Sequence, residues 1–287
     1  MYGHLEQRTQ EWHLTRSERI TASECTAAFK GASKIARYEL IMRKLFPQTN
    51  GDGTMGAACL WGTHFEPVAK QIYCAVKGGG TIADTSCVVH PVHKFIGASP
   101  DGIYLPSPEN PEWGQLLEIK CPISRVFDDT SPVPPEYYHQ MQMQMACCDI
   151  WTCDFVEMKF SKTKKVCAFN GCYKIYDDGH IEYGSEEHEG ECRVVWWGVE
   201  QYRIKKIARD PAWLDDHIQE FSELWTEVLE HRKNGTSPSD PRQEGVLRIN
   251  LPDDLIPVPA EAVPNRGVES GLSTARTTKK VTLRIEM

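Results

Sequence analysis

The sequence predicts an α/β fold in which helices flank a small mixed sheet, followed by a C-terminal tail. Apolar residues recur at helical spacing over most of the first 77 residues, and the period changes to that of strands between residues 81 and 121. A helical pattern returns at 134–148 and is followed by further strand-like runs. With 40% hydrophobic residues in 287, the chain can bury one sizeable core. We therefore predict one domain at residues 1–234 and an extended tail at 235–287.

The N-terminal half begins with helices and continues with strands. The expected helices are 5–14, 22–30, 36–46 and 56–77, and the expected strands are 81–89, 94–98, 102–105 and 115–121. Thr21 or Ser23 can cap the second helix, because its side-chain oxygen accepts from a free N–H group of the first turn. Three consecutive glycines from Gly78 end the fourth helix. Pro, Gly and Asn separate the strands.

In the C-terminal half, segments with helical periodicity again alternate with segments with strand periodicity. The expected elements are a helix at 134–148, strands at 151–160, 164–169, 172–176 and 192–197, and helices at 199–208 and 211–233. An apolar stripe at helical spacing from Trp213 to Leu229 supports the last helix and indicates packing. The tail is rich in Pro, Ser, Thr and Gly, which is typical of extended segments. Within it, 246–251 and 281–285 alternate like strands, and they either pair with the body, a neighbouring subunit or a partner, or stay unpaired.

Charge and composition limit the classes of protein to which the chain can belong. The formal net charge is −8, and seven acidic residues with no Lys or Arg fall in 177–191, whereas five lysines and no acids fall in 158–174. Such alternation of basic and acidic segments is typical of an enzyme that moves along a phosphate backbone and contacts only part of it. No apolar run approaches the roughly 18 residues of a membrane helix, and the N-terminus lacks the apolar core of a secretory signal. Eleven cysteines without a C-x-x-C motif suggest a reducing, intracellular compartment.

One group of charged residues predicts a metal site. Asp101 lies in a Ser-Pro-Asp-Gly turn, and Glu118 and Lys120 stand two apart on the next expected strand, so both point to one face while Ile119 points to the other. Charges on an apolar strand are costly unless they meet a metal and a substrate. Two carboxylates from neighbouring strands can hold Mg²⁺. Each fragment alone is also common as a surface turn or a solvated strand, so the prediction of a metal site depends on their combination.

Asp101 followed by Glu118-x-Lys120 resembles the signature of the PD-(D/E)xK nucleases, which have a restriction-endonuclease-like core. The wider pattern is similar to the phage lambda exonuclease or YqaJ-type viral recombinase family. Five segments match that family's motifs in order, and the resemblance covers about residues 8–233. The segments are Arg16–Ser23, Trp61–Glu66, Ser99–Gly102, Glu118–Pro122 and Tyr137–Gln142.

The resemblance implies roles for the residues of the metal centre. Asp101 and Glu118 resemble the metal-binding carboxylates, and the backbone carbonyl of Ile119 resembles a third ligand. Glu66 resembles the helix carboxylate that supports the metal site, and Lys120 resembles the catalytic lysine. The implied cofactor is Mg²⁺, for which Mn²⁺ can substitute.

The resemblance also implies a binding pocket for the 5′-phosphate of DNA. Arg16, Ser23 and Gln140 resemble that pocket, while Tyr137 and Gln142 resemble residues that support the helix beside it. The chain departs from the family pattern at two places. Glu18 stands where the family often has Gly, and the segment 170–191 resembles an added acidic hairpin.

The implied activity is Mg²⁺-dependent 5′→3′ exonucleolysis of double-stranded DNA, which leaves 3′ single-stranded overhangs for homologous recombination by strand annealing. The implied partners are double-stranded DNA ends, a single-strand annealing protein and further copies of the chain in a homotrimeric ring, with no membrane. The implied compartment is the cytoplasm of a bacterial host or, for a eukaryotic virus, the host cytoplasm or nucleus. The alternatives are another PD-(D/E)xK nuclease, such as an endonuclease or repair nuclease, and a non-catalytic DNA-binding assembly module.

Overall fold

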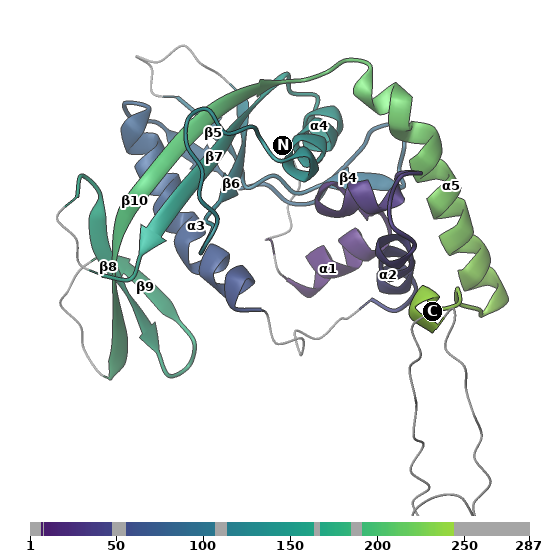
Figure 1. The fold of residues 1–287 in the computed structure, drawn as a ribbon, viewed down its shortest axis with the longest axis horizontal. Coiled ribbons are helices and arrows are strands. Elements are labelled where there is room, and N and C mark those ends of the chain that lie inside the picture. Colours follow the sequence, from purple (N-terminus) through teal and green to yellow (C-terminus); the bar gives the residue numbers. More distant parts are fainter. Residues whose placement is uncertain are drawn as a thin grey trace, which may run out of the picture. The chain divides into compact units, whose positions relative to one another are not determined.

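A computed structural model describes residues 7, 9–47, 56–106, 114–163, 167–184 and 191–243 (Figure 1). The chain divides into two compact units, Met1–Pro238 and Ser239–Met287. The described part of the second unit holds one 3₁₀ turn, η2 (Pro241–Gln243). The strand-like segments 246–251 and 281–285 lie outside the described residues.

The first unit is built on a seven-stranded mixed sheet, so the predicted α/β class with a mixed sheet is confirmed. The strand order is β2-β5-β6-β7-β10-β8-β9. The parallel pair is β6 with β7, and the other neighbouring pairs are antiparallel. The bounds are β2 (Thr81–Ala83), β5 (Gly102–Leu105), β6 (Gln115–Lys120), β7 (Thr152–Ser161), β8 (Asn170–Tyr176), β9 (Ile181–Gly184) and β10 (Cys192–Ala208).

Two helices cover opposite faces of this sheet (Figure 1). The helix α3 (Ala57–Val76) packs its apolar residues against Leu117 and Ile119 of β6 and against Val156 of β7. The helix α4 (Pro135–Cys148) packs methionines against Leu116 on the other face of β6. Because successive residues of a strand point to opposite faces, β6 sends alternate side chains towards α3 and α4.

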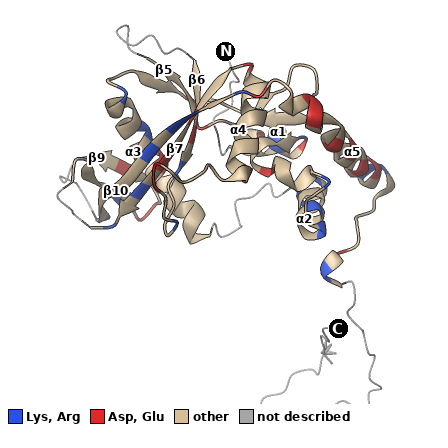
Figure 2. Ribbon diagram, turned by 45° about the horizontal axis from the view of Figure 1, so that its top comes forward, with Lys and Arg blue, Asp and Glu red and all other residues tan. Residues whose placement is uncertain are grey.

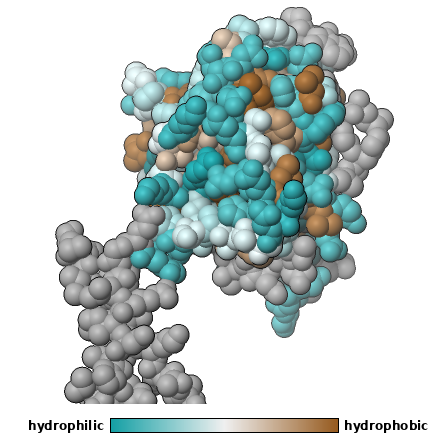
Figure 3. Space-filling model, turned by 90° about the vertical axis from the view of Figure 1, so that its right-hand side faces the viewer, coloured by the Kyte–Doolittle hydropathy of each residue, from teal (hydrophilic) through white to brown (hydrophobic). Residues whose placement is uncertain are grey.

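The remaining helices form a second cluster with a small sheet. That sheet has the order β1-β4-β3, with β1 (Ile20–Thr21) parallel to β4 (Ile96–Ala98) and β3 (Val88–Val89) antiparallel to it. The helices are α1 (Gln10–Ser17), the 3₁₀ helix η1 (Ala22–Ala28), α2 (Lys34–Leu45) and α5 (Trp213–Asn234). Apolar residues of η1, α2 and α5 share one core with Met143 of α4. The face in Figure 3 is mostly hydrophilic, with apolar residues scattered over it.

Three sequence-based assignments need correction. The predicted helix at 199–208 is the second half of β10, which pairs with β7 out to Ala208. The predicted helix at 22–30 is a 3₁₀ helix that ends at Ala28. The predicted strand at 81–89 is two short strands that belong to different sheets. In the first and third cases strand pairing, which local periodicity does not contain, decides the outcome.

The added hairpin expected at 170–191 is present as the antiparallel pair of β8 and β9, and residues 185–190 lie outside the described residues. Of the expected strand at 164–169, residues 164–166 also lie outside, and the following three residues are not a strand. Within the described ranges, no helix is long and apolar enough to cross a bilayer.

Candidate active site

The turn that carries Asp101 is fastened to β6. The backbone N–H of Asp101 donates to the carbonyl oxygen of Leu117 at 3.1 Å, and the N–H of Ile119 donates to Asp101 Oδ2 at 2.6 Å. The Thr85 hydroxyl donates to the carbonyl oxygen of Pro100 at 2.6 Å. Asp101 therefore lies against β6, the strand of Glu118, as expected for residues on neighbouring strands.

Glu118 is completely buried and faces α4. Its Oε1 accepts from the Gln140 amide at 2.9 Å, and its Oε2 accepts from the Gln144 amide at 2.6 Å. Its Oε1 also forms an ion pair with Lys120. The prediction that Glu118 and Lys120 share a face is confirmed, because Ile119 packs in the core on the α3 side. Residues four apart on a helix lie above one another, so both glutamines reach the same carboxylate.

The site has more negative than positive charge. Burial raises the pKa of Asp101 well above its usual value, and the carboxylates of Glu118 and Glu66 raise it further. Burial alone would lower the pKa of Lys120, but Glu118 and Asp101 outweigh burial and raise that pKa. Lys120 is thus held as an ammonium, and one ammonium faces several carboxylates.

Glu66 reaches this site from α3. Its carboxylate forms an ion pair with Lys70 at 3.1 Å, one turn further along the helix, and Lys70 also pairs with Asp84 at 3.2 Å. The charge of Glu66 also contributes to the raised pKa of Asp101.

The donor set fits a hard divalent cation. Among the described residues, no group of three or more His, Cys, Asp and Glu side chains is arranged to hold a metal ion. A cation here would therefore depend on Asp101 and Glu118, with a backbone oxygen such as that of Ile119. Mg²⁺ is commonly bound through one or two carboxylates and keeps water and phosphate as its other ligands. Burial, together with the charges of Glu118 and Glu66, raises the pKa of Asp101, and a cation bound here would favour its ionised form.

Arg16 lies in a pocket of hydroxyl groups next to this centre. Its guanidinium donates to Ser99 Oγ at 3.3 Å and to the hydroxyls of Thr21 and Ser23, each at 3.1 Å. The Trp12 ring centroid lies 4.5 Å from the guanidinium carbon, and the Trp12 indole N–H donates to Ser99 Oγ at 3.2 Å. In the described part of the chain, Arg16 forms no ion pair with a carboxylate, so its charge is available to an anion.

Neighbouring residues hold the backbone of this pocket. The Glu24 carboxylate accepts from the backbone N–H and the hydroxyl of Thr21, each at 2.9 Å, and forms an ion pair with Lys44. Lys44 also donates to the carbonyl oxygen of Arg16 at 3.1 Å. Although burial would raise the pKa of Glu24, the pair with Lys44, the N–H of Thr21 and the charge of Arg16 together lower it. Glu24 is therefore paired with Lys44, and the side chain of Arg16 stays with the hydroxyls.

The structure separates some residues that the sequence groups together. Gln140 binds Glu118 rather than Arg16. Gln142 is buried, its amide donating to the carbonyl oxygen of Ala208 at 2.9 Å and its oxygen accepting from the N–H of Asp210 at 2.8 Å, so it anchors α4 to the end of β10. Tyr137 lies beside Lys120, whose Nζ is 4.7 Å from the ring centroid.

Two site residues are absent from the sequence-based set. Ser99 joins the Arg16 pocket to the carboxylates, because it stands two residues before Asp101 and accepts from Arg16. Gln144 binds Glu118, and its spacing of four from Gln140 was the available signal. Ser99 gave no such signal, because its partners lie more than 80 residues away in the sequence.

Comparisons with known proteins show which family and which folds the chain is similar to. Residues 11–151 match the family model of the YqaJ-like viral recombinase domain, which confirms the resemblance that the sequence motifs indicated. The fold is similar to an alkaline exonuclease from Laribacter hongkongensis, with a TM-score of 0.53 and 25% identity over 79% of this chain and 95% of that chain. The same exonuclease in complex with dAMP gives a TM-score of 0.52 and 26% identity over the same shares.

A viral sequence is also similar. An uncharacterised protein of Acanthamoeba polyphaga mimivirus is 26% identical over 170 residues, which are 55% of this chain and 30% of that protein. The chain thus matches less than a third of the length of this curated relative. The restriction-endonuclease-like core predicted from the sequence agrees with the exonuclease folds.

Proposed function

Because the chain carries a YqaJ-like viral recombinase domain over residues 11–151, we propose that it is a Mg²⁺-dependent exonuclease acting on ends of double-stranded DNA. The proposed direction is 5′→3′ along one strand. The observation that carries the proposal is that the hydroxyl pocket at Arg16 lies directly beside the carboxylates of the candidate metal centre. Ser99 accepts from Arg16 in the hydroxyl pocket and stands two residues before the half-buried Asp101.

The pocket has the chemistry of a site for a terminal phosphate. Arg16 offers charge-assisted, two-pronged hydrogen bonds, and Thr21, Ser23 and Ser99 add hydroxyls. A terminal phosphate carries more negative charge than an internal phosphodiester, so this pocket should prefer it. A strand held by its 5′ end would place the next phosphodiester near Asp101.

Asp101, Glu118 and the carbonyl of Ile119 would hold Mg²⁺ or Mn²⁺, with Glu66 in support. Such an ion polarises a phosphodiester and lowers the pKa of a bound water. Gln140 and Gln144 keep Glu118 in place by occupying both of its oxygens. Lys120, held by Glu118 and Tyr137, would orient the attacking water or stabilise charge that develops on the phosphate.

The wider biological role follows from family resemblance. The products would be 3′ single-stranded overhangs for recombination by strand annealing, and a single-strand annealing protein would be the partner. A homotrimeric ring around DNA would keep the enzyme on one strand. Residues 1–234 would form the nuclease domain, and 235–287 would serve as an extended or partner-binding tail.

A labelled duplex tests this proposal. Linear duplex labelled at the 5′ or 3′ end is incubated with and without Mg²⁺, beside covalently closed circular DNA. We expect Mg²⁺-dependent loss of nucleotides from 5′ ends and intact circles. Asp101→Asn should abolish hydrolysis while DNA binding persists, whereas Glu230→Gln, on the exposed side of α5, should be fully active. Cleavage of the circles would indicate an endonuclease, and full activity of Asp101→Asn would remove the metal centre from the mechanism.

A further inference from the structure

A second buried carboxylate, Glu157 of β7, lies beside the proposed active site and has no role in the proposed reaction. Strand register sets Glu157 between Lys120 of β6 and Arg203 of β10. Glu157 is completely buried, and Arg203 is 3% exposed. Burying such charges is costly unless they are paired and fully hydrogen-bonded. The partners of Glu157 therefore indicate what it does.

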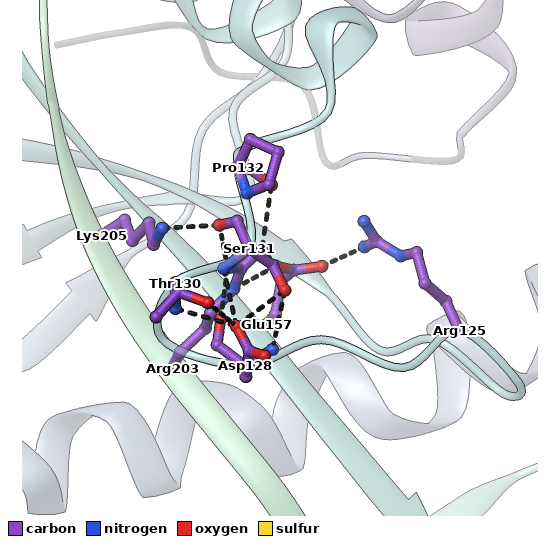
Figure 4. Close-up of polar contacts among 8 residues, drawn as sticks. All are labelled: Arg125, Asp128, Thr130, Ser131, Pro132, Glu157, Arg203 and Lys205. Atoms are coloured by element: carbon purple, nitrogen blue, oxygen red, sulfur yellow. Dashed lines mark hydrogen bonds and ion pairs between the residues drawn. The ribbon is translucent and has the colours of Figure 1, made fainter.

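Two arginines share the two oxygens of Glu157 (Figure 4). Oε1 forms an ion pair with Arg125. Oε2 accepts from Nε of Arg203 at 2.5 Å and also pairs with Nη2 of that arginine. In Figure 4, Arg125 reaches Glu157 from the right of the view, while Lys205 lies at the left. One carboxylate thus fixes two guanidinium groups that come from different parts of the chain.

Arg203 extends this contact to the segment that joins β6 to α4. Its Nη1 donates to the carbonyl oxygens of Asp128, at 2.7 Å, and of Ser131, and its Nη2 donates to that of Pro132 at 3.3 Å. Lys205 adds a 2.6 Å hydrogen bond to the carbonyl oxygen of Ser131. Because this segment leads directly from Lys120 into α4, Arg203 fixes the backbone between the two.

Arg125 extends the contact to an aromatic ring at the active site. Its guanidinium carbon lies 5.4 Å from the ring centroid of Tyr137, in the first turn of α4. The Nζ of Lys120 lies 4.7 Å from the same centroid. Two cations thus share one ring, and cation–π contacts favour fixed positions for both. Two chains of contacts thus connect Glu157 with Lys120. One runs through Arg125 and Tyr137, and the other runs through Arg203 and the segment between β6 and α4.

We propose that Glu157 is a positioning residue for Lys120, which rests on the function proposed above for that lysine. Glu157 is completely buried, so it acts through its arginines and not on the substrate. Removal of its charge should release Arg125 from Tyr137 and loosen the segment before α4. Lys120 would then spend less time in its working position, and turnover should fall more than DNA affinity.

Glu157→Gln is the first test, because it keeps the size of the side chain and removes its charge. We expect kcat to fall roughly 10- to 100-fold, as for a catalytic group displaced by about 1 Å. KM for duplex ends should stay within about threefold, since the binding pocket at Arg16 is unchanged. Glu200→Gln is the matched control, because Glu200 lies on β10 and pairs with Lys159 at 3.7 Å. A kcat for Glu157→Gln equal to that of the control would overturn the proposal.

Arg125→Ala supplies a second test that leaves the buried pair of Glu157 and Arg203 in place. Arg125 is partly exposed, so this variant should fold even if Glu157→Gln does not. We expect a loss of kcat similar to that of Glu157→Gln, and a double variant no worse than the worse single variant. Such non-additivity is typical of residues that act through one another. Unchanged kcat in Arg125→Ala, or losses that multiply in the double variant, would refute the route through Arg125.

Hydrogen exchange gives a readout that needs no nuclease activity. Backbone amides of residues 121–134 should exchange faster in Glu157→Gln than in Glu200→Gln, because the segment loses its anchor. Equal exchange would show that Glu157 does not fix this segment. If the unmutated protein hydrolyses no DNA, the proposed function fails, while this measurement still decides whether Glu157 anchors the segment.

Discussion

The carboxylate of Glu118 shows how single residues make a charged site possible inside a protein. It is completely buried, yet both oxygens accept from glutamine amides and one also pairs with Lys120. A buried carboxylate without such partners would be protonated or would destabilise the fold. The hydrogen bonds from Gln140 and Gln144 therefore help the protein to accommodate a buried carboxylate at this position.

Gln144→Ala should destabilise the protein. The amide of Gln144 is completely buried and donates to Glu118 Oε2, so its removal leaves a buried oxygen without its donor. We expect a loss of about 1–3 kcal/mol in the free energy of unfolding, measured by urea denaturation. Gln219→Ala is the control, because Gln219 bonds to Glu223 at the surface of α5. Equal stability of the two variants would contradict the assigned hydrogen bond.

Arg16→Ala should erase a preference for phosphorylated ends. The unmutated protein should degrade 5′-phosphorylated duplex roughly tenfold or more faster than 5′-hydroxyl duplex, because hydrogen bonds to a charged group contribute about 1.5–3 kcal/mol. Arg37→Ala, which breaks a surface pair with Glu227, should keep the preference. Both substrates are compared at one salt concentration. Equal rates for both ends in the unmutated protein would refute the pocket.

The sequence could place Glu118 and Lys120 on one face, because that depends only on strand alternation. It could not place Ser99 beside Arg16 or Glu157 between its arginines. Those contacts join residues 83, 32 and 46 positions apart. Local spacing contains no information on such pairs, and only the assembled sheet brings them together.

The helix α4 contacts three other parts of the molecule through residues within two turns. Gln140 and Gln144 reach Glu118, Gln142 reaches the end of β10, and His139 meets Trp213 at the start of α5. The Nδ1 of His139 accepts from the Trp213 indole N–H at 2.9 Å. The contact between α4 and α5 thus requires a neutral imidazole.

Acidification should weaken this contact between helices. Burial, followed by repulsion from His217, lowers the pKa of His139. The unfolded chain therefore binds a proton more readily than the folded chain, and stability should fall as the pH drops below about 6.5, the ordinary pKa of His. Thermal unfolding between pH 5 and pH 8 measures this effect. His139→Gln should flatten the profile and the exposed His180→Gln should not, and identical profiles would refute the assignment.

The strand β10 shows where prediction of elements fails. Its second half was predicted as a helix, but β10 runs without interruption from Cys192 to Ala208. Its partner β7 pairs with this half and β8 pairs with the other half. In Figure 2 basic positions lie along β10, while acidic positions gather on α5. The helices α2, α3, α4 and α5 were all predicted, and local signals sufficed for them. For α3 and α5 these signals were long apolar stripes and glycines at or near the helix ends.

At the scale of the whole molecule, the body should not need the tail. The three hydrophobic clusters of the described residues draw on the segment from Ile20 to Val228. Deletion of 244–287 should therefore change the melting temperature by no more than about 2 °C, as for changes outside a core, and should leave nuclease activity intact. A much larger fall in calorimetry would mean that 246–251 or 281–285 adds a strand to the body.

The central position of β10 has a consequence for synthesis. A ribosome completes Asp101, Glu118 and Lys120 long before it reaches Arg203. Until then, Arg125 is the one partner of Glu157 among the described residues, and β7 has an open edge where β10 will pair. On the function proposed here, a nascent or prematurely terminated chain carries the reactive residues without the strand that fixes their surroundings. On that proposed function, the order of the strands would delay DNA degradation until translation of the domain is nearly finished.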